Sequence, residues 1–176
     1  FAVKEVHEAG FLHLDIQDGN VFIKGSLSAE DNLVSLVDFG AARPVCEDGL
    51  CPVIRDRALF STMGFESPEI VGHNDGTLRL GAEADLYSVG YLLLLMLTGK
   101  RYTQRELDSA NIGLYLSKRK LKKLNCPAHM ADKVHQIISK ALKKTPEERY
   151  HSCEEMLADV SDLIHALQPY KSDLSQ

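Results

Sequence analysis

Three side chains with oxygen ligands lie close together in the chain, and their order suits phosphoryl transfer. Asp15 and Asn20 stand in the run His13-Leu14-Asp15-Ile16-Gln17-Asp18-Gly19-Asn20, and Asp38 opens the triplet Asp38-Phe39-Gly40. The Asp15 carboxylate can accept or orient the proton of an attacking hydroxyl. The oxygens of Asn20 and Asp38 are the ligand type that Mg²⁺ takes, because this cation keeps several waters and needs few protein ligands.

Short strands are expected to hold these side chains in place. Residues 1 to 9 predict an amphipathic helix that ends at Gly10, and residues 11 to 20 predict a loop. Residues 21 to 24 and 33 to 37 are apolar enough for two strands, joined by a polar turn. An Asp and an Asn before the first strand, and Asp-Phe-Gly after the second, form the layout of a phosphoryl-transfer site.

Most of the remaining chain is expected to be helical. After an irregular stretch to about residue 62, the apolar residues of 84 to 97 lie all round a helix and predict burial, while residues 103 to 116 and 128 to 142 predict further helices. Thr145-Pro146-Glu147-Glu148 and Ser152-Cys153-Glu154-Glu155 have the capping-box pattern, so each predicts a helix start. The expected fold class is mainly α, a helical body with a short β-ribbon that carries the site.

Composition excludes several classes of protein. The chain has 176 residues, of which 44% are hydrophobic and 26% charged, as in one globular domain. A net charge of −5 gives no attraction to nucleic acid or anionic lipid. Four scattered cysteines do not make a disulfide scaffold, so a reducing cytoplasm is expected. The most apolar stretch, residues 91 to 97, is far shorter than the roughly 20 residues of a membrane span.

Three further segments give the site a family context. Ser67-Pro68-Glu69 resembles the end of a protein kinase activation segment, and Asp85-Leu86-Tyr87-Ser88-Val89-Gly90 resembles the start of that family's central helix. Arg149 stands where the family has an Arg that pairs with the Glu of Pro-Glu. Together with residues 13–20 and 38–40, these segments resemble the C-terminal lobe of a eukaryotic-like Ser/Thr protein kinase, in wording closest to bacterial members.

The resemblance implies roles for the named residues. Residues 1–176 would form one lobe with a catalytic loop at 13–20, a Mg²⁺ loop at 38–40 and an activation segment at 38–69, acting with ATP and Mg²⁺ on a protein substrate. The residues implied in catalysis or binding are Asp15, Gln17, Asn20, Asp38, Phe22 beneath adenine, and Thr62, which favours Ser or Thr as acceptor. Those implied in holding the site are His13, Phe39, Glu69, Asp85 and Arg149.

Departures from the family pattern bear on activity. Gln17 stands where Ser/Thr kinases have a Lys, which removes a charge aimed at the transferring phosphate, and Leu14 replaces an Arg that binds a phosphorylated activation loop. The glycine loop, the ATP-contacting Lys and its Glu partner belong to an N-terminal lobe that these residues do not include. The chain alone is therefore expected to transfer phosphate poorly.

Two other functions fit parts of the pattern. A pseudokinase or an isolated lobe that acts as a binding module would explain Gln17 and the missing lobe, although it would not require Asp15, Asn20 and Asp38 to be kept together. Aminoglycoside and choline phosphotransferases also use an Asp, an Asn and a second Asp in such loops. They rank lower because they lack the pairing of Pro68-Glu69 with Arg149 and the helix start at Asp85.

Overall fold

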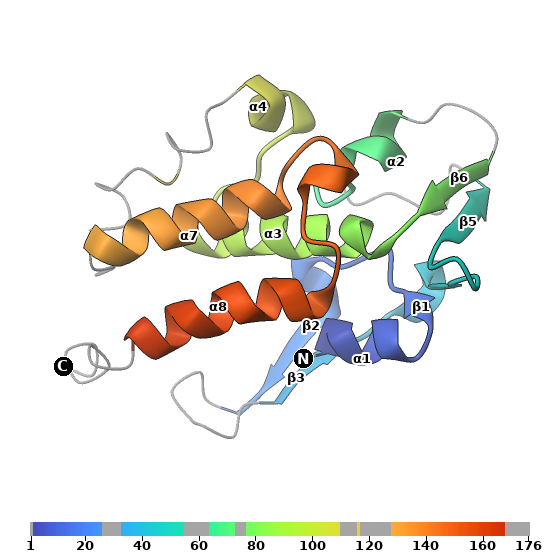
Figure 1. Cartoon of the computed structure of the whole chain (residues 1–176), viewed down its shortest axis with the longest axis horizontal. Coiled ribbons are helices and arrows are strands. Elements are labelled where there is room, and N and C mark those ends of the chain that lie inside the picture. The colour runs from blue at the N-terminus through green and yellow to red at the C-terminus, as the bar shows by residue number, and fades with distance from the viewer. Residues whose placement is uncertain are drawn as a thin grey trace.

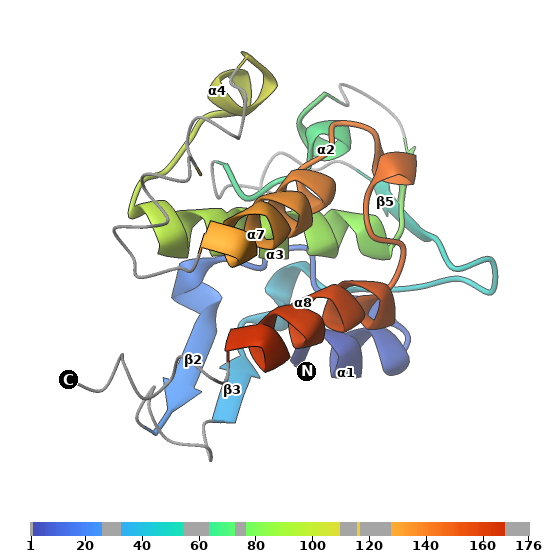
Figure 2. The same ribbon diagram turned by 60° about the vertical axis from the view of Figure 1, so that its left-hand side comes forward.

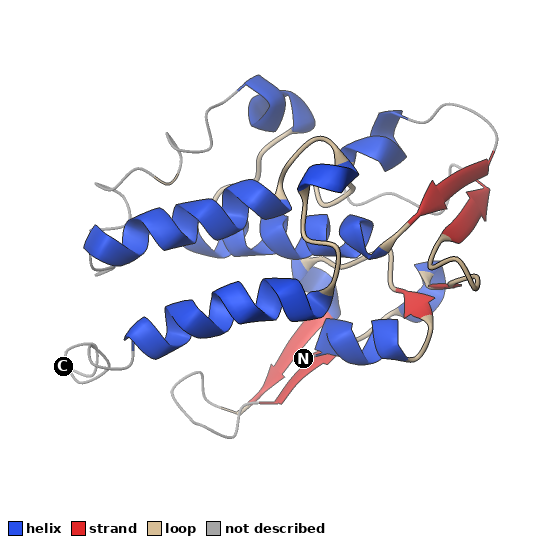
Figure 3. Ribbon diagram, in the orientation of Figure 1, coloured by secondary structure: helices blue, strands red, loops and turns tan. Residues whose placement is uncertain are grey.

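The computed structural model describes residues 2–25, 33–54, 64–72, 77–109, 116 and 128–167. In this part of the chain, helices form the body and small antiparallel sheets lie along one side and at one end of it (Figure 1 and Figure 3). This confirms the predicted fold class of a mainly helical, kinase-like lobe. No helix among these residues is both long enough and apolar enough to cross a membrane.

Most of the described helical residues lie in the second half of the chain. The α-helices are α1 (Ala2–Glu8), α2 (Pro68–Gly72), α3 (Ala82–Thr98), α4 (Gln104–Ser109), α7 (Ala128–Ala141) and α8 (Cys153–Leu167). Three short 3-10 turns are η1 (Asp18–Asn20), η2 (Phe39–Ala41) and η3 (Pro146–Glu148). Figure 2 shows α7 and α8 on one side of α3, with α1 beside the beginning of α8.

The described strands pair into three separate antiparallel ladders. They are β1 (Phe11–Leu12) with β4 (Arg43–Pro44), β2 (Val21–Lys24) with β3 (Leu33–Leu36), and β5 (Cys51–Ile54) with β6 (Thr77–Leu80). Only the second ladder was predicted. The prediction of an irregular stretch to residue 62 was wrong at β5, whose partner β6 is more than 20 residues away along the chain, so that no local turn announces the pairing.

Helix α3 is the centre of the body. Its apolar residues contribute to all three core clusters, and its far turn leaves Met96 largely exposed. Gly90 faces α7 so closely that a Cβ at this position would collide with the Cβ of Ala141. A glycine here lets the two helix backbones approach each other, which is the reason that α3 and α7 pack tightly.

The two predicted helix starts near the end of the chain have different outcomes. The Ser152 hydroxyl accepts a hydrogen bond from the Glu155 amide at 3.2 Å, and α8 begins at the next residue, as predicted. The start at Thr145 gives only the turn η3, because Arg149 leaves it in an extended conformation, with φ −88° and ψ −170°. The predicted helix of residues 103–116 is described only as α4, and residues 110–115 lie outside the described part of the chain.

Candidate active site

The β2–β3 ladder brings Asn20 and Asp38 to the same end of the ribbon. Val21 at the start of β2 pairs with Leu36 at the end of β3. One step further, the Val37 amide donates to the Asn20 carbonyl at 3.0 Å. Asp38 follows directly, so the antiparallel register alone makes the two predicted Mg²⁺ ligands neighbours although 18 positions separate them in the sequence.

Asp15 lies within a cluster of amide groups. The Gln17 amide nitrogen donates to both carboxylate oxygens of Asp15, at 3.1 Å each. The Asn20 amide nitrogen donates to Asp15 Oδ2 and to the Asp15 carbonyl, at 2.9 Å each. The structure thus brings together Asp15, Gln17 and Asn20, the residues predicted for catalysis. The amide of Gln17 reaches the carboxylate of Asp15, whereas the sequence suggested that it would point at a phosphate.

The oxygens of Asn20 and Asp38 suit a hard cation. Because Asn20 uses its amide nitrogen on Asp15, its amide oxygen points the other way. Asp38 has φ +61°, a rare backbone conformation for a residue with a side chain, and its Oδ1 accepts from the Gly40 amide at 3.2 Å. The described residues hold no group of three or more His, Cys, Asp and Glu in metal-binding positions. Mg²⁺ requires only one or two carboxylates beside its waters, so the pair of oxygens fits it.

His13 links the loop that contains Asp15 to the backbone directly before Asp38. Its side chain is fully buried, its Nε2 lies 3.2 Å from the Val37 carbonyl, and its Nδ1 accepts from the Asp15 amide at 3.3 Å. The ring of Phe39 packs against it at 4.9 Å between centroids. Since both nitrogens of His13 are engaged with the backbone, this ring holds the loops and cannot serve as a base at the site.

Asp85, at the start of α3, holds the backbone of the predicted catalytic loop. Its buried carboxylate accepts hydrogen bonds from the amides of His13 and Leu14, at 2.8 Å each. His7 of α1 makes a third contact, with Nε2 at 2.8 Å from Asp85 Oδ2. Burial lowers the pKa of His7, but the hydrogen bonds to Asp85 and Cys153 outweigh it and raise the pKa to about 9. His7 was not among the predicted site residues, because a single His on a short helix forms no local pattern.

Arg149 and Glu69 form a two-pronged ion pair inside the protein. The guanidinium Nη1 donates to Glu69 Oε1 at 2.8 Å and Nη2 donates to Oε2 at 2.6 Å, with the Arg149 side chain fully buried. The remaining N–H groups of Arg149 reach three backbone carbonyls, those of Lys143, Lys144 and Glu83. With all five donors bonded, this pair ties α2, at the end of the predicted activation segment, to the turn before α8.

Leu14, an apolar residue, stands at the position where the kinase pattern has an Arg. It is 8% exposed and packs in the cluster that contains Leu12, Ile70 and Leu80. Its φ of +62° is the strained left-handed conformation. The two backbone bonds to Asp85 and the apolar packing hold this conformation, which turns the chain so that Asp15 emerges toward the ribbon.

Some contacts of the site escaped the sequence patterns. Arg101, after α3, forms a two-pronged pair with Asp18 of the catalytic loop, at 2.7 and 2.8 Å. Gln104 of α4 donates to the Glu66 carbonyl at 2.8 Å and fixes the segment before Pro68-Glu69. An Arg and an Asp this far apart in sequence leave no spacing signal. Thr62, predicted near the acceptor, lies outside the described residues.

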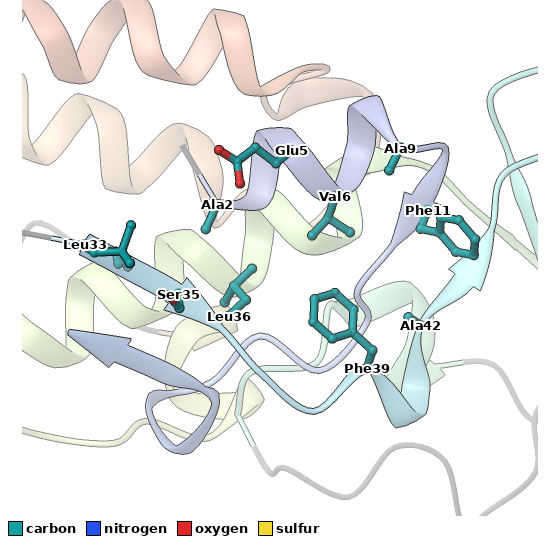
Figure 4. A pocket seen from close by; sticks show the side chains of 11 residues that line it. Ala2, Glu5, Val6, Ala9, Phe11, Leu33, Ser35, Leu36, Phe39 and Ala42 are labelled. Carbon is teal, nitrogen blue, oxygen red and sulfur yellow. The ribbon is translucent and has the colours of Figure 1, made fainter. Parts of the chain in front are cut away.

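Two exposed aromatic rings and an apolar cavity lie beside this end of the ribbon. Phe22 on β2 is 58% exposed and Phe39 is 51% exposed. Phe39 also lines a cavity of about 880 Å³ between α1, β3 and η2, where Figure 4 shows Val6, Leu36 and Phe11 around the same space. The described residues therefore leave a large apolar surface open next to the predicted Mg²⁺ loop.

Comparisons with known proteins place the chain in a family. A family model described as "Protein kinase domain" matches residues 1–160. The chain is 27% identical over 154 residues to Serine/threonine-protein kinase PknB of Mycolicibacterium smegmatis, covering 88% of this chain and 23% of that protein.

Similar relatives occur in animals and plants. Serine/threonine-protein kinase PLK4 of Drosophila grimshawi is 30% identical over 152 residues, which is 86% of this chain and 18% of that protein. Serine/threonine-protein kinase AtPK1/AtPK6 of Arabidopsis thaliana is 33% identical over 154 residues, which is 86% of this chain and 28% of that protein. The chain thus spans less than a third of the length of these relatives. The match over residues 1–160 shows that the chain belongs to the protein kinase domain family.

Proposed function

We propose that this chain is the C-terminal lobe of a Ser/Thr protein kinase and carries the residues that orient the acceptor hydroxyl and hold the metal. The arrangement around Asp15 carries the proposal. Its carboxylate lies at the end of the β2–β3 ribbon, fixed by the Gln17 and Asn20 amides at 2.9 to 3.1 Å. The relatives named as Ser/Thr kinases favour Ser or Thr as the acceptor.

Each residue of the site has one task in this proposal. Asp15 accepts a hydrogen bond from the hydroxyl of the substrate and aims it in line for transfer. Asn20 and Asp38 supply the oxygens that hold Mg²⁺. Bound ATP would supply the phosphoryl group, and Mg²⁺ would neutralise part of the negative charge of the phosphates. Phe22, exposed on β2, offers an apolar face for the adenine ring.

We further propose that a second, smaller lobe completes the site. Positioning of the phosphates provides most of the rate in this chemistry, and the family resemblance assigns it to a glycine loop, a Lys and a Glu that precede the catalytic loop. The apolar cavity of about 880 Å³ and the exposed ring of Phe39 are surfaces that such a lobe would cover. Without it, residues 1–176 alone should transfer phosphate at least a hundredfold more slowly.

A transfer assay on the intact protein that contains residues 1–176 tests the role of Asp15. Transfer of the γ-phosphate of labelled ATP to casein is measured for the wild type and for Asp15→Asn, which keeps the size and removes the charge. We expect a loss of at least a hundredfold, in the range that positioned acid–base groups contribute. Asp18→Asn is the matched control, because this neighbouring carboxylate faces Arg101, and it should lose less than tenfold. Equal activity of Asp15→Asn and wild type would overturn the assignment.

The metal assignment has its own measurement. Asp38→Asn should raise the Mg²⁺ concentration that gives half-maximal transfer at least tenfold, since a neutral amide binds this cation more weakly than a carboxylate does. Glu47, an exposed carboxylate between β4 and β5, provides the control as Glu47→Gln, with no change expected. An unchanged Mg²⁺ requirement in Asp38→Asn would contradict its role as a ligand.

A binding module without activity is the second candidate, and one observation favours it. The amide of Gln17 bridges both oxygens of Asp15, where the family has a charged Lys. If the intact wild-type protein transfers no phosphate to casein or to itself, yet binds ATP with Mg²⁺, the enzyme proposal fails and this second candidate stands.

A further inference from the structure

A cysteine, a histidine and an aspartate line up in a hydrogen-bonded row where α1, α3 and α8 come together. Cys153 at the start of α8 has its sulfur 3.4 Å from Nδ1 of His7, and Nε2 of the same ring lies 2.8 Å from Asp85 Oδ2. The three residues come from α8, α1 and α3, which meet here (Figure 1). A thiol placed against an imidazole whose other nitrogen is held by a carboxylate is the arrangement of an activated nucleophile.

The hydrogen bonds fix the direction of proton flow in this row. The Asp85 carboxylate already accepts from the amides of His13 and Leu14, so its bond to His7 requires Nε2 of the ring to be the donor. Nδ1 therefore faces the sulfur at 3.4 Å. Burial lowers the pKa of His7, but its hydrogen bonds raise it to about 9, so at pH 7 the ring is protonated and its Nδ1–H points a positive charge at the sulfur.

An apolar cavity lies directly beside the sulfur-bearing residue. It has a volume of about 170 Å³, and its walls include Cys153, Val3, Val89, Leu93, Met156 and Val160. Val3, Val89 and Val160 are half-buried, so the cavity reaches the surface, while Cys153 itself is 6% exposed. A cavity of roughly 150 Å³ with such walls holds a molecule the size of benzene. The space suits a short, uncharged chain of about seven heavy atoms.

We propose that Cys153 is a covalent modification site for short α,β-unsaturated aldehydes, which enter this cavity and add to the sulfur. In the step, the sulfur gives its S–H proton to solvent and forms a bond to the β-carbon of the aldehyde, while protonated His7 stabilises the negative charge that forms on the sulfur. The C=C π pair moves toward the carbonyl, the α-carbon takes a proton from His7 Nδ1, and solvent returns a proton to Nδ1. The product is a thioether and the reaction is a net addition, with nothing oxidised or reduced. This site is independent of the phosphoryl-transfer proposal.

Other cysteines of the chain provide an internal comparison. Cys46 is exposed, so any small reagent can reach it, whereas Cys153 can be reached only through the cavity. On exposure alone Cys46 should react faster. For an apolar aldehyde we expect the opposite order, because the cavity concentrates the reagent and protonated His7 stabilises the charge that forms on the sulfur.

The test treats the full chain with trans-2-hexenal at pH 7 and measures the adduct at each cysteine by peptide mass spectrometry over time. We expect the rate at Cys153 to exceed that at Cys46 at least tenfold. His7→Gln, which retains a donor for Asp85 but removes the positive charge beside the sulfur, should lower the Cys153 rate at least tenfold and leave Cys46 unchanged. A rate at Cys153 no greater than that at Cys46, or an unchanged rate in His7→Gln, would overturn the proposal.

A second variant guards against a loss of structure in the first. Val160→Phe fills the cavity from a position two turns further along α8, away from the His7–Asp85 bond, and should slow addition at Cys153 at least fivefold. In urea the cavity is lost, and the rates at Cys153 and Cys46 should become equal. If Val160→Phe stays folded by circular dichroism and reacts at the wild-type rate, the aldehyde does not use the cavity and the proposal fails.

Discussion

At the scale of single residues, the predicted catalytic loop differs from the kinase pattern at two positions, Gln17 and Leu14. Gln17 places a neutral amide across both oxygens of Asp15, and Leu14 places an apolar side chain in the core where a cation was expected. Both changes remove positive charge from the neighbourhood of the predicted site. The Gln17 amide thus contacts Asp15 at a position where the family has a charged Lys, which weakens the stabilisation of a negative transition state.

Restoring the charge at residue 17 should raise activity. In the intact protein, Gln17→Lys brings an ammonium group to the place from which the amide now reaches Asp15, and it should stabilise the transferring phosphate by about 1.4 kcal/mol, or about tenfold in rate. The assay is transfer of labelled γ-phosphate to casein. Gln17→Met is the control of similar length without charge or donor, and should not exceed the wild type. A lysine variant no faster than the wild type would show that charge at this position does not limit the rate.

His7 should make stability depend on pH in a defined direction. Its pKa is raised from 6.5 to about 9 in the folded chain, because the bonds to Asp85 and Cys153 outweigh burial. A raised pKa means that the folded state binds the proton more tightly than the unfolded state does. The contribution, of order 3 kcal/mol, is complete below about pH 6.5 and is lost as the pH rises through about 9.

Urea unfolding at pH 6 and pH 9.5 measures this contribution. The free energy of unfolding of the wild type should fall between these two values, and that of His7→Gln should fall by about 3 kcal/mol less. Identical pH slopes in the two proteins would mean that His7 is not protonated in the folded state.

At the scale of elements, the close contact of α3 and α7 depends on one missing side chain. Gly90→Ala would put a Cβ onto the Cβ of Ala141, so the two helices must separate. We expect a loss of about 1–3 kcal/mol in the free energy of unfolding, the usual cost of overpacking a core. Gly72→Ala on α2 is the control, since a Cβ there meets nothing within 4 Å and should be neutral or slightly stabilising. Equal stability of the two variants would contradict a tight contact.

The elements also show how far local patterns reach. The β2–β3 ribbon, α3, α7 and α8 were predicted, because each has a period, a cap or a polar turn within its own residues. The ladder of β5 and β6 was not, since its pairing depends on strands that only the fold brings together. The neighbouring positions of Asn20 and Asp38 follow from the register of one hairpin. The contacts of His7 with Asp85 and of Arg101 with Asp18 do not, because residues 78 and 83 positions apart share no local signal.

At the scale of the whole molecule, the buried pair of Arg149 and Glu69 joins parts that no backbone hydrogen-bond ladder connects. Glu69→Gln would leave a fully buried guanidinium without its counter-charge, and we expect a loss of about 3–5 kcal/mol in the free energy of unfolding. Glu148→Gln is the matched control, because this carboxylate is 56% exposed and faces Lys143 at 4.0 Å. It should cost less than about 1 kcal/mol. Urea titration measures the free energy of unfolding of both variants. Equal losses would show that the buried ion pair stabilises the fold no more than the exposed one does.

The contacts that support Asp15 also set an order in which the chain can mature. The row through Asp85 ends at Cys153, whose contact with His7 joins residues 146 positions apart. A ribosome adding about 5 to 20 residues per second needs roughly 7 to 30 s to make the chain between them. During that interval residues 13–20 have been made but α8 has not, and until residue 149 is made Glu69 has no Arg149 with which to pair. Newly made molecules therefore acquire a firm site only after Arg149 and α8 have been made, and chaperones that hold nascent chains would meet residues 1–140 with the central helix α3 still partly uncovered.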